Sequence, residues 1–444
     1  MNPIRGRRPN IIFILADDMG YGDLSILGQK NFQTPNLDRM VQEGLFLGNH
    51  YAGSTVCAPS RATLLTGQHT GHVWQRGNGP IEFRPDPKDI TIATRLKDAG
   101  YHTAMIGKSG VACVSDDPTL PNRKGFDHFF GFLCHVAAHR YFPPALYRNG
   151  KKINFPNNKG KDGDVYSGDL ILDDALNYIH NRGKSGQPFF LHLALQQPHA
   201  DLYAPQEFRA PYLNRFDERP FDGNHYRPQS HPAATYAAMI QYIDHSVRRV
   251  LQKLRQLNIE KDTLVIFSSD NGSHHVGGYH YSMLGSNGPF RGGKRDFYDG
   301  GIRVPTIAWW PETIEPGSRS DHLSAFWDFA PTALELAGLP IPDKIDGISY
   351  VPTLLGQPEQ QQQHTYLYWE FYESHGKQAV RCGKWKGIRL DVMKDRHGPL
   401  KLYNLEEDPG ETKDVSKQHP DIVQKIAGFM IQAHQTPEFE GFRF

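Results

Sequence analysis

Cys57 opens the run Cys57-Ala58-Pro59-Ser60-Arg61, whose residue types could support nucleophilic chemistry. The proline two residues on and the stretch that ends at Gly67 predict a short helix beginning at the cysteine. Amides at the amino end of a helix carry positive potential and favour an oxyanion beside them. Arg61 would add several hydrogen-bond donors at the same place. Without the residues around it, Cys57 would be read as a buried thiol rather than as a nucleophile.

Polar residues also follow predicted strands at four separate places. The strands run directly into Asp17-Asp18, Gly107-Lys108, the segment 196–199 that ends at His199, and Asp270-Asn271. Sites in open α/β sheets form at the carboxyl ends of strands, so these side chains are expected to meet. Turns favour Asp, Asn and Gly as well, and ordinary turn residues are the alternative interpretation.

The oxygen-bearing side chains among these residues point to one kind of metal. Asp17, Asp18, Asp270 and Asn271 offer hard oxygen ligands, and no pair of histidines or cysteines accompanies them. Such a set suits Ca²⁺ or Mg²⁺ rather than zinc.

The elements that must position these residues alternate along the first two-thirds of the chain. Strand-like runs cover residues 10–16, 101–106, 188–195 and 263–268, and helical spacing covers 35–41, 92–99, 170–179 and 237–254, with Thr34 as the predicted N-cap of the first helix. This alternation predicts an α/β sandwich with a large, mostly parallel sheet flanked by helices.

A break in composition follows this region. Residues 346–363 are rich in Pro, Gly and Gln and are predicted to be a linker after a catalytic domain at 1–345. Strand-like runs at 366–370, 379–389 and 402–403, followed by a helix near 421–433, predict a smaller C-terminal α+β domain at 364–444 with an antiparallel sheet.

Residues 200–232 show no periodicity. A segment of this kind is either a loop that faces the substrate or a loop with a structural role only.

Bulk properties exclude several classes of protein. The chain has 444 residues and a formal net charge of +1, so neither nucleic acid nor a membrane surface is an expected partner. The apolar run at 11–16 is too short for a membrane span or a signal segment. A periplasmic or secreted protein whose leader is missing from this chain is expected, with a cytoplasmic one as the alternative. Four scattered cysteines, Cys57, Cys113, Cys134 and Cys382, indicate no disulfide framework.

The run around Cys57 resembles the signature of the formylglycine sulfatases, Cys-x-Pro-Ser-Arg with Thr-Gly following. The resemblance spans nearly the whole chain and is strongest to arylsulfatase-A-like bacterial polysaccharide sulfatases. It implies an alkaline-phosphatase-like sandwich and the oxidation of Cys57 to formylglycine by a formylglycine-generating enzyme or an anaerobic maturase. It also implies a divalent cation, usually calcium, held by residue 57 together with Asp17, Asp18, Asp270 and Asn271.

The same resemblance implies roles for individual side chains. Lys108 and Lys294 would contact sulfate, Arg61 would hold the aldehyde hydrate and the carboxylates, and His199 would protonate the departing alcohol. The sequence departs from the family at Ser109-Gly110, where tryptophan and histidine are common. His139, in a run similar to one found in some relatives, is predicted to replace the missing histidine.

Together these features predict a sulfuric ester hydrolase acting on a sulfated carbohydrate, a polysaccharide or oligosaccharide such as carrageenan or a glycosaminoglycan. Subsites are expected from the segment 200–232 and from the residues His274, His275, His280, His375 and Arg381. Two alternatives stay open: a phosphomonoester or phosphonate hydrolase of the same superfamily with Cys57 unmodified, and a non-catalytic sulfated-glycan-binding protein.

Overall fold

The structure of the chain is a computed structural model that describes residues 8–79, 82–110, 120–160 and 162–444. Cys113 lies outside these residues. Within them, ten strands form one large sheet in the order β11 (Ser318–Ser320), β2 (Leu45–Leu47), β10 (Ile307–Trp309), β9 (Thr263–Ser269), β1 (Asn10–Asp17), β8 (Phe189–Pro198), β4 (His102–Lys108), β5 (His128–Phe132), β6 (Ala145–Arg148) and β7 (Lys151–Asn154).

The five central strands, from β9 to β5, all run in the same direction. Because both faces of this part of the sheet are covered, its strands are mostly apolar, with polar residues gathered toward their ends. On β1, the residues at 11, 13 and 15 enter one apolar core and those at 12, 14 and 16 enter the other. The carboxyl ends of the five strands consequently meet at a single edge of the sheet.

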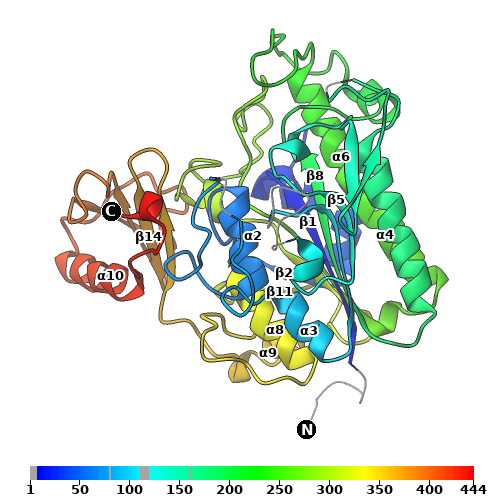
Figure 1. Cartoon of the computed structure of the whole chain (residues 1–444). Helices are drawn as coiled ribbons and strands as arrows, with labels where there is room; N and C mark the ends of the chain where they lie inside the picture. The colour runs from blue at the N-terminus through cyan, green and yellow to red at the C-terminus, as the bar shows by residue number, and fades with distance from the viewer. Residues whose placement is uncertain (1–7, 80–81, 111–119, 161) are drawn as a thin grey trace.

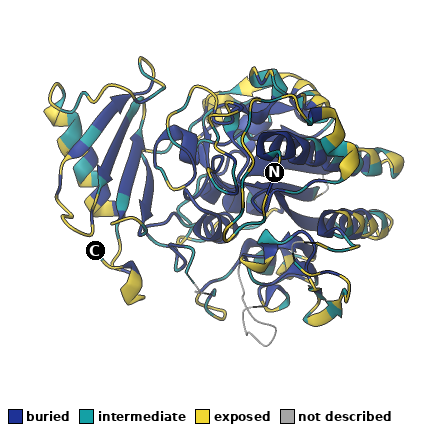
Figure 2. Ribbon diagram, turned by 90° about the horizontal axis from the view of Figure 1, so that it is seen from above, coloured by how far each residue is buried: buried dark blue, intermediate teal, exposed yellow. Residues whose placement is uncertain are grey.

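Helices cover both faces of the large sheet (Figure 1). On one face lie α1 (Pro35–Gln42), α4 (Ser167–Gly183) and α6 (Pro232–Gln256). On the other lie α2 (Cys57–Thr66), α3 (Ile92–Asp98), α8 (Phe329–Leu336) and the short α9 (Val351–Leu354). Figure 2 shows the buried strands between helices whose outer sides are exposed. This confirms the predicted α/β architecture.

A second, antiparallel sheet follows in chain order, built from β13 (Leu367–Phe371), β14 (Lys377–Cys382), β15 (Trp385–Leu390) and β16 (Leu400–Asn404). The predicted run 379–389 therefore forms a hairpin. One face packs on α10 (Pro420–Ala433), and the other packs against the main body through Trp369 and Trp327. The smaller elements are β3 (His50–Tyr51), β12 (Ser324–Ala325), α5 (Gln206–Arg209) and α7 (Asp299–Ile302).

The predicted linker packs against the main body. Val351 and Leu354 of α9 belong to the same apolar cluster as α3 and α8. The domain limits at residues 345 and 364 stay a prediction. No helix in the described part of the chain combines the length and apolar character needed to cross a membrane.

The predicted N-cap of the first helix is confirmed in position, but its amides are satisfied by another residue. Thr34 stands at the N-cap position of α1, but its side chain makes no capping hydrogen bond and donates to Asp38 instead, at 2.9 Å. Asp244 of α6 accepts from the backbone amides of Asn36 and Leu37 at 2.9 and 2.8 Å. A carboxylate from a helix far along the chain thus satisfies the amides that a local side chain was expected to satisfy.

A buried carboxylate joins the second sheet to the main body. Glu370 of β13 accepts hydrogen bonds from Arg76, and also from Tyr368, Tyr372 and His434. Arg76 donates as well to the carbonyl oxygen of Gln435, at 2.8 Å. The segment that follows α2 is therefore tied to the C-terminal part of the chain.

Candidate active site

The predicted oxygen ligands come together at the carboxyl edge of the large sheet. Asp17 is the last residue of β1 and Asp18 follows it. Asp270 and Asn271 follow β9, the strand next to β1. Asn271 Nδ2 donates to Asp18 Oδ1 at 2.7 Å, and the backbone amide of Asp18 donates to Asp270 Oδ1 at 3.1 Å. The adjacency of two parallel strands thus brings together residues more than two hundred positions apart.

Cys57 lies beside this group of oxygen atoms. It is the first residue of α2, a helix that is buried throughout, and Gly67 ends the helix in the left-handed conformation (φ 76°), as predicted. Ligand atoms of Asp17, Cys57 and Asp270 all lie within 4.8 Å of one another. The side chain at position 57 therefore faces both the acidic group and the amino end of a helix.

Arg61 connects three parts of the site from one turn further along α2. Its Nε and Nη2 donate to Asp270 Oδ2 at 3.0 and 2.8 Å, and Nη1 donates to the carbonyl oxygen of Lys108 at 3.0 Å. The guanidinium is fully buried. Its planar fork fixes the carboxylate after β9 relative to the end of β4.

Two lysines balance the charge of the carboxylates. Lys108 Nζ donates to Asp17 Oδ2 at 2.6 Å, and Lys294 Nζ lies 2.7 Å from Asp18 Oδ1. Burial acts to lower the pKa of each lysine, but the adjacent carboxylates outweigh it and raise both pKa values. Burial acts to raise the pKa of Asp17, yet Lys108 and the other cations hold that pKa well below its usual range. Both lysines are charged at neutral pH.

The site also fits a divalent cation. Asp17 Oδ1 and Asn271 Oδ1 are buried and have no hydrogen-bond partner among the described residues. An orphaned carboxylate oxygen and an orphaned amide oxygen next to further carboxylates form a hard donor set, which Ca²⁺ and Mg²⁺ prefer. Burial and the neighbouring Asp17 raise the pKa of Asp270, so a cation here would relieve repulsion between these acids.

Two stacked imidazole rings, those of His139 and His199, lie beside the carboxylates. His199 follows β8 and His139 follows β5; their ring centroids are 3.9 Å apart with an interplanar angle of 17°. His199 Nδ1 pairs with the carbonyl oxygen of Ala200, which leaves Nε2 facing Asp18 Oδ2 at 3.5 Å. Both ring nitrogens of His139 are buried and lack a partner in the described structure. Burial lowers the pKa of both rings, helped by His199 at His139 and by Lys294 at His199.

Packing leaves little room for a side chain at position 110. Gly110 has φ 70°, and a Cβ atom there would lie 2.8 Å from Cδ of Arg61. Ser109 is turned away, because its hydroxyl donates to the carbonyl oxygen of Leu133 at 2.7 Å. The space that a side chain at 110 would need is thus occupied by Arg61, whereas His139 reaches the site from the segment after β5.

A pocket of about 350 Å³ opens onto the site. Its walls hold the predicted residues His139, His199, Lys294, His274 and His275, together with Tyr226 from the segment 200–232; sequence reasoning missed Asn78, His135 and Arg295. His280 and His375 are not part of the lining. Arg381, on β14 of the second sheet, does not line this pocket either.

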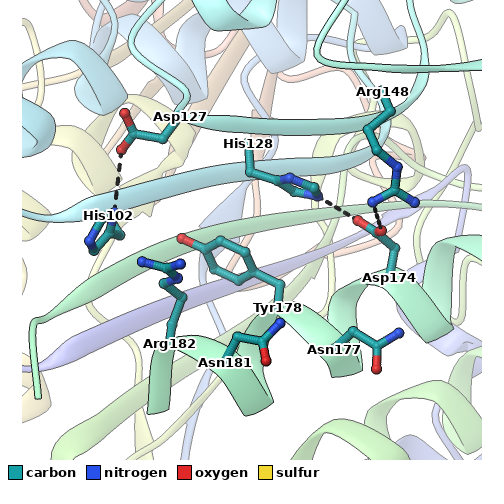
Figure 3. A pocket seen from close by; sticks show the side chains of 9 residues that line it. All are labelled: His102, Asp127, His128, Arg148, Asp174, Asn177, Tyr178, Asn181 and Arg182. Atoms are coloured by element: carbon teal, nitrogen blue, oxygen red, sulfur yellow. Dashed lines mark hydrogen bonds and ion pairs between the residues drawn. The ribbon is translucent and has the colours of Figure 1, made fainter. Parts of the chain in front are cut away.

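Another pocket, of about 420 Å³, lies at the opposite edge of the sheet, where β4 and β5 begin (Figure 3). Its acids already have cationic partners. Asp174 contacts His128 and Arg148 at 2.6 Å each, and Asp127 contacts Lys97 at 2.8 Å. None of the predicted site residues lines it. The pocket beside Cys57 is therefore the candidate active site.

Comparison with known proteins agrees with this geometry. Residues 9–339 match the family model for sulfatases, and residues 288–435 match the model for the C-terminal part of N-sulphoglucosamine sulphohydrolase. The chain belongs to the sulfatase family. As a member it is a sulfuric ester hydrolase, and the alkaline-phosphatase-like fold predicted from the sequence is the fold of these enzymes.

The relatives include sulfatases whose names specify a sulfated sugar. The N-acetylgalactosamine-6-sulfatase of Homo sapiens is 34% identical over 96% of this chain and 85% of its own length, and that of Canis lupus familiaris is 32% identical over 96% and 86%. The crystal structure of i-CgsB in complex with k-i-k-neocarrahexaose superposes with a TM-score of 0.81 at 26% identity, covering 98% of this chain and 95% of the other. The family generally uses formylglycine and a divalent metal.

Proposed function

We propose that this sulfatase removes sulfate from a sulfated carbohydrate, with formylglycine made from Cys57 as its nucleophile and Ca²⁺, or alternatively Mg²⁺, as its cation. The observation that carries the proposal is the convergence of polar side chains from adjacent parallel strands around the first residue of α2. In this arrangement a helix terminus, two lysines and an arginine surround the place where an anion would lie.

Asp17, Asp18, Asp270 and Asn271 would hold the cation, with residue 57 as a further ligand. A divalent cation there supplies Lewis acidity, and the hydrate of formylglycine supplies a hydroxyl that can attack sulfur. Lys108 pairs with Asp17 and Lys294 pairs with Asp18, and both lysines can turn toward sulfate oxygens while remaining charged. Arg61 keeps the carboxylate of Asp270 and the end of β4 in fixed positions.

The two histidines would move protons. His199 directs Nε2 into the site, because its Nδ1 is engaged by the Ala200 carbonyl oxygen. Once protonated, Nε2 donates to the sugar oxygen as the S–O bond breaks. His139 has two unpartnered nitrogens beside that ring and accepts the proton that residue 57 must lose before sulfate leaves.

A galactose-based substrate fits best. N-acetylgalactosamine-6-sulfatase and the carrageenan-oligosaccharide complex of i-CgsB name ligands of this kind, and a sulfated galactan or a glycosaminoglycan is therefore our choice. Tyr226 offers an aromatic face to a pyranose ring, and Arg295 and His275 offer polar contacts at the same pocket. A polymer of this kind is met outside the cytoplasm, which favours a periplasmic or secreted place of action.

The test combines mass spectrometry with turnover. The chain is produced together with a formylglycine-generating enzyme, and the peptide containing Cys57 should show the lower mass of formylglycine. With Ca²⁺ present, sulfate should be released from sulfated galacto-oligosaccharides and from an aryl sulfate, but not from Cys57→Ser, which should still bind substrate. An unmodified Cys57 with faster hydrolysis of an aryl phosphate or phosphonate would favour the phosphohydrolase alternative. Confirmed formylglycine with binding but no turnover would favour the sulfated-glycan-binding alternative.

A further inference from the structure

Asn78 contacts both the backbone at the start of α2 and the side chain at position 57. Its Oδ1 accepts a hydrogen bond from the backbone amide of Ala58 at 3.0 Å. Its Nδ2 donates toward Sγ of Cys57 at 3.8 Å, within the range of a hydrogen bond to sulfur. Asn78 also lines the active-site pocket. No pattern in the sequence connects Asn78 with Cys57, and only the fold brings them together.

The first contact compensates for a missing cap. Val56 is the N-cap residue of α2 and has no side-chain acceptor, so the first amides of the helix need another partner. Asn78 provides that partner from a separate segment. With Oδ1 held by the Ala58 amide, one N–H of Nδ2 is directed toward Sγ of Cys57.

The carboxamide is itself held in place. Arg76, two residues earlier, donates to Glu370 and to the Gln435 carbonyl oxygen, so the backbone is anchored to the C-terminal part of the chain. A Cβ atom at Gly77 would lie 2.9 Å from the ring of Phe442, which shows how closely that ring covers the backbone next to Asn78. The backbone that carries Asn78 is therefore held in place on both sides of Gly77.

We propose that Asn78 is a positioning residue, whose Nδ2 donates a hydrogen bond to a Cβ substituent of residue 57 and fixes the orientation of the nucleophile. The proposal rests on the proposed function, since in the mature enzyme the substituent would be an oxygen of formylglycine in place of Sγ. An N–H donor at that oxygen both restricts rotation about the Cα–Cβ bond and stabilises negative charge on it. Nothing in the family match assigns this role.

Two substitutions separate the donor from the cap. Asn78→Asp keeps an oxygen that can accept from the Ala58 amide but loses the donor, whereas Asn78→Ala loses both. If the donor positions residue 57, kcat at saturating substrate falls about a hundredfold in both variants. Only Asn78→Ala should also lower the unfolding temperature, by about 2 °C, because only it leaves the amide without a partner. The added charge of Asn78→Asp should also weaken substrate binding and raise KM. Measuring kcat at saturating substrate removes this effect on binding from the comparison of the variants.

Asn177→Asp is the matched control, because it makes the same chemical change on the exposed side of α4, at the pocket of Figure 3. Its kcat and unfolding temperature should equal those of the wild type. The formylglycine content of every variant is measured by mass spectrometry, and kcat is expressed per formylglycine.

A normal kcat in Asn78→Asp would reduce Asn78 to a helix cap and overturn the proposal. Loss of formylglycine in both Asn78 variants would also overturn it, because the role of Asn78 would then be in maturation. A wild-type protein without formylglycine would instead refute the proposed function, a result that is distinct from either of these.

Discussion

Arg61→Lys tests whether the site needs a planar guanidinium or only a positive charge. In the wild type, Asp270 receives two of the three hydrogen bonds of Arg61 and the Lys108 carbonyl oxygen receives the third. A lysine keeps the charge, but its ammonium cannot reach both partners from the same buried backbone position. Two bonds are lost, each worth about 1.5–3 kcal/mol because one partner is charged. The free energy of unfolding should therefore fall by about 3–6 kcal/mol.

Urea unfolding of both proteins, followed by fluorescence, measures this loss. Arg148→Lys is the control, since Arg148 is 45% exposed and makes an ion pair with Asp174 at 2.6 Å; its effect should stay within about 0.5 kcal/mol. Because Asp270 and the end of β4 lose their common support, kcat/KM of Arg61→Lys should also fall about a hundredfold. Equal urea midpoints for Arg61→Lys and Arg148→Lys, with normal kcat/KM, would refute the reasoning.

Three further predictions concern protons and charge. His199→Gln should lower kcat/KM about 10²- to 10⁴-fold for a sulfated sugar and much less for nitrophenyl sulfate, whose leaving group needs no proton; equal losses on both substrates would contradict this role. Chelation of divalent ions should lower the unfolding temperature, and Ca²⁺ should restore it, with about 2.7 kcal/mol of stabilisation at a hundredfold excess over Kd; unchanged calorimetric scans would argue against a structural cation. Burial lowers the pKa of His50 from 6.5 to about 4, so its contribution to stability is complete above pH 6.5 and is lost as pH falls toward 4. His50→Gln should remove about 3 kcal/mol of that pH dependence, seen as a flatter plot of urea midpoint against pH.

The framework of the fold could be predicted because the sequence repeats one simple pattern. Apolar runs such as that of β1 end in polar residues, and parallel strands bring such endings to one edge. Local capping was less predictable, since the amides at the start of α1 are satisfied by Asp244 from α6 and not by the adjacent Thr34. A side chain that arrives from a distant element leaves no local signature.

The same limit applies to the site. Cys57 and Arg61 are one turn apart on a single helix, so their spacing predicted their proximity. Asn78 was missed because its contact with Ala58 depends on how the chain returns after α2. The sequence showed that glycine stands at position 110 where relatives often have histidine. It could not show that the Arg61 side chain lies against that position, because Arg61 is far from Gly110 in the chain.

The contact between Arg76 and Glu370 has a consequence for how such enzymes can be recombined. Glu370 lies on the second sheet, whereas Arg76 belongs to the segment that carries Asn78 into the pocket. A chimera that takes its C-terminal unit from a relative would leave a buried guanidinium without its carboxylate unless the segment around Arg76 is exchanged with it. The smaller sheet thus helps to hold the segment that lies beside residue 57. In chimeras of sulfatases, this sheet and the segment around Arg76 should therefore come from the same parent.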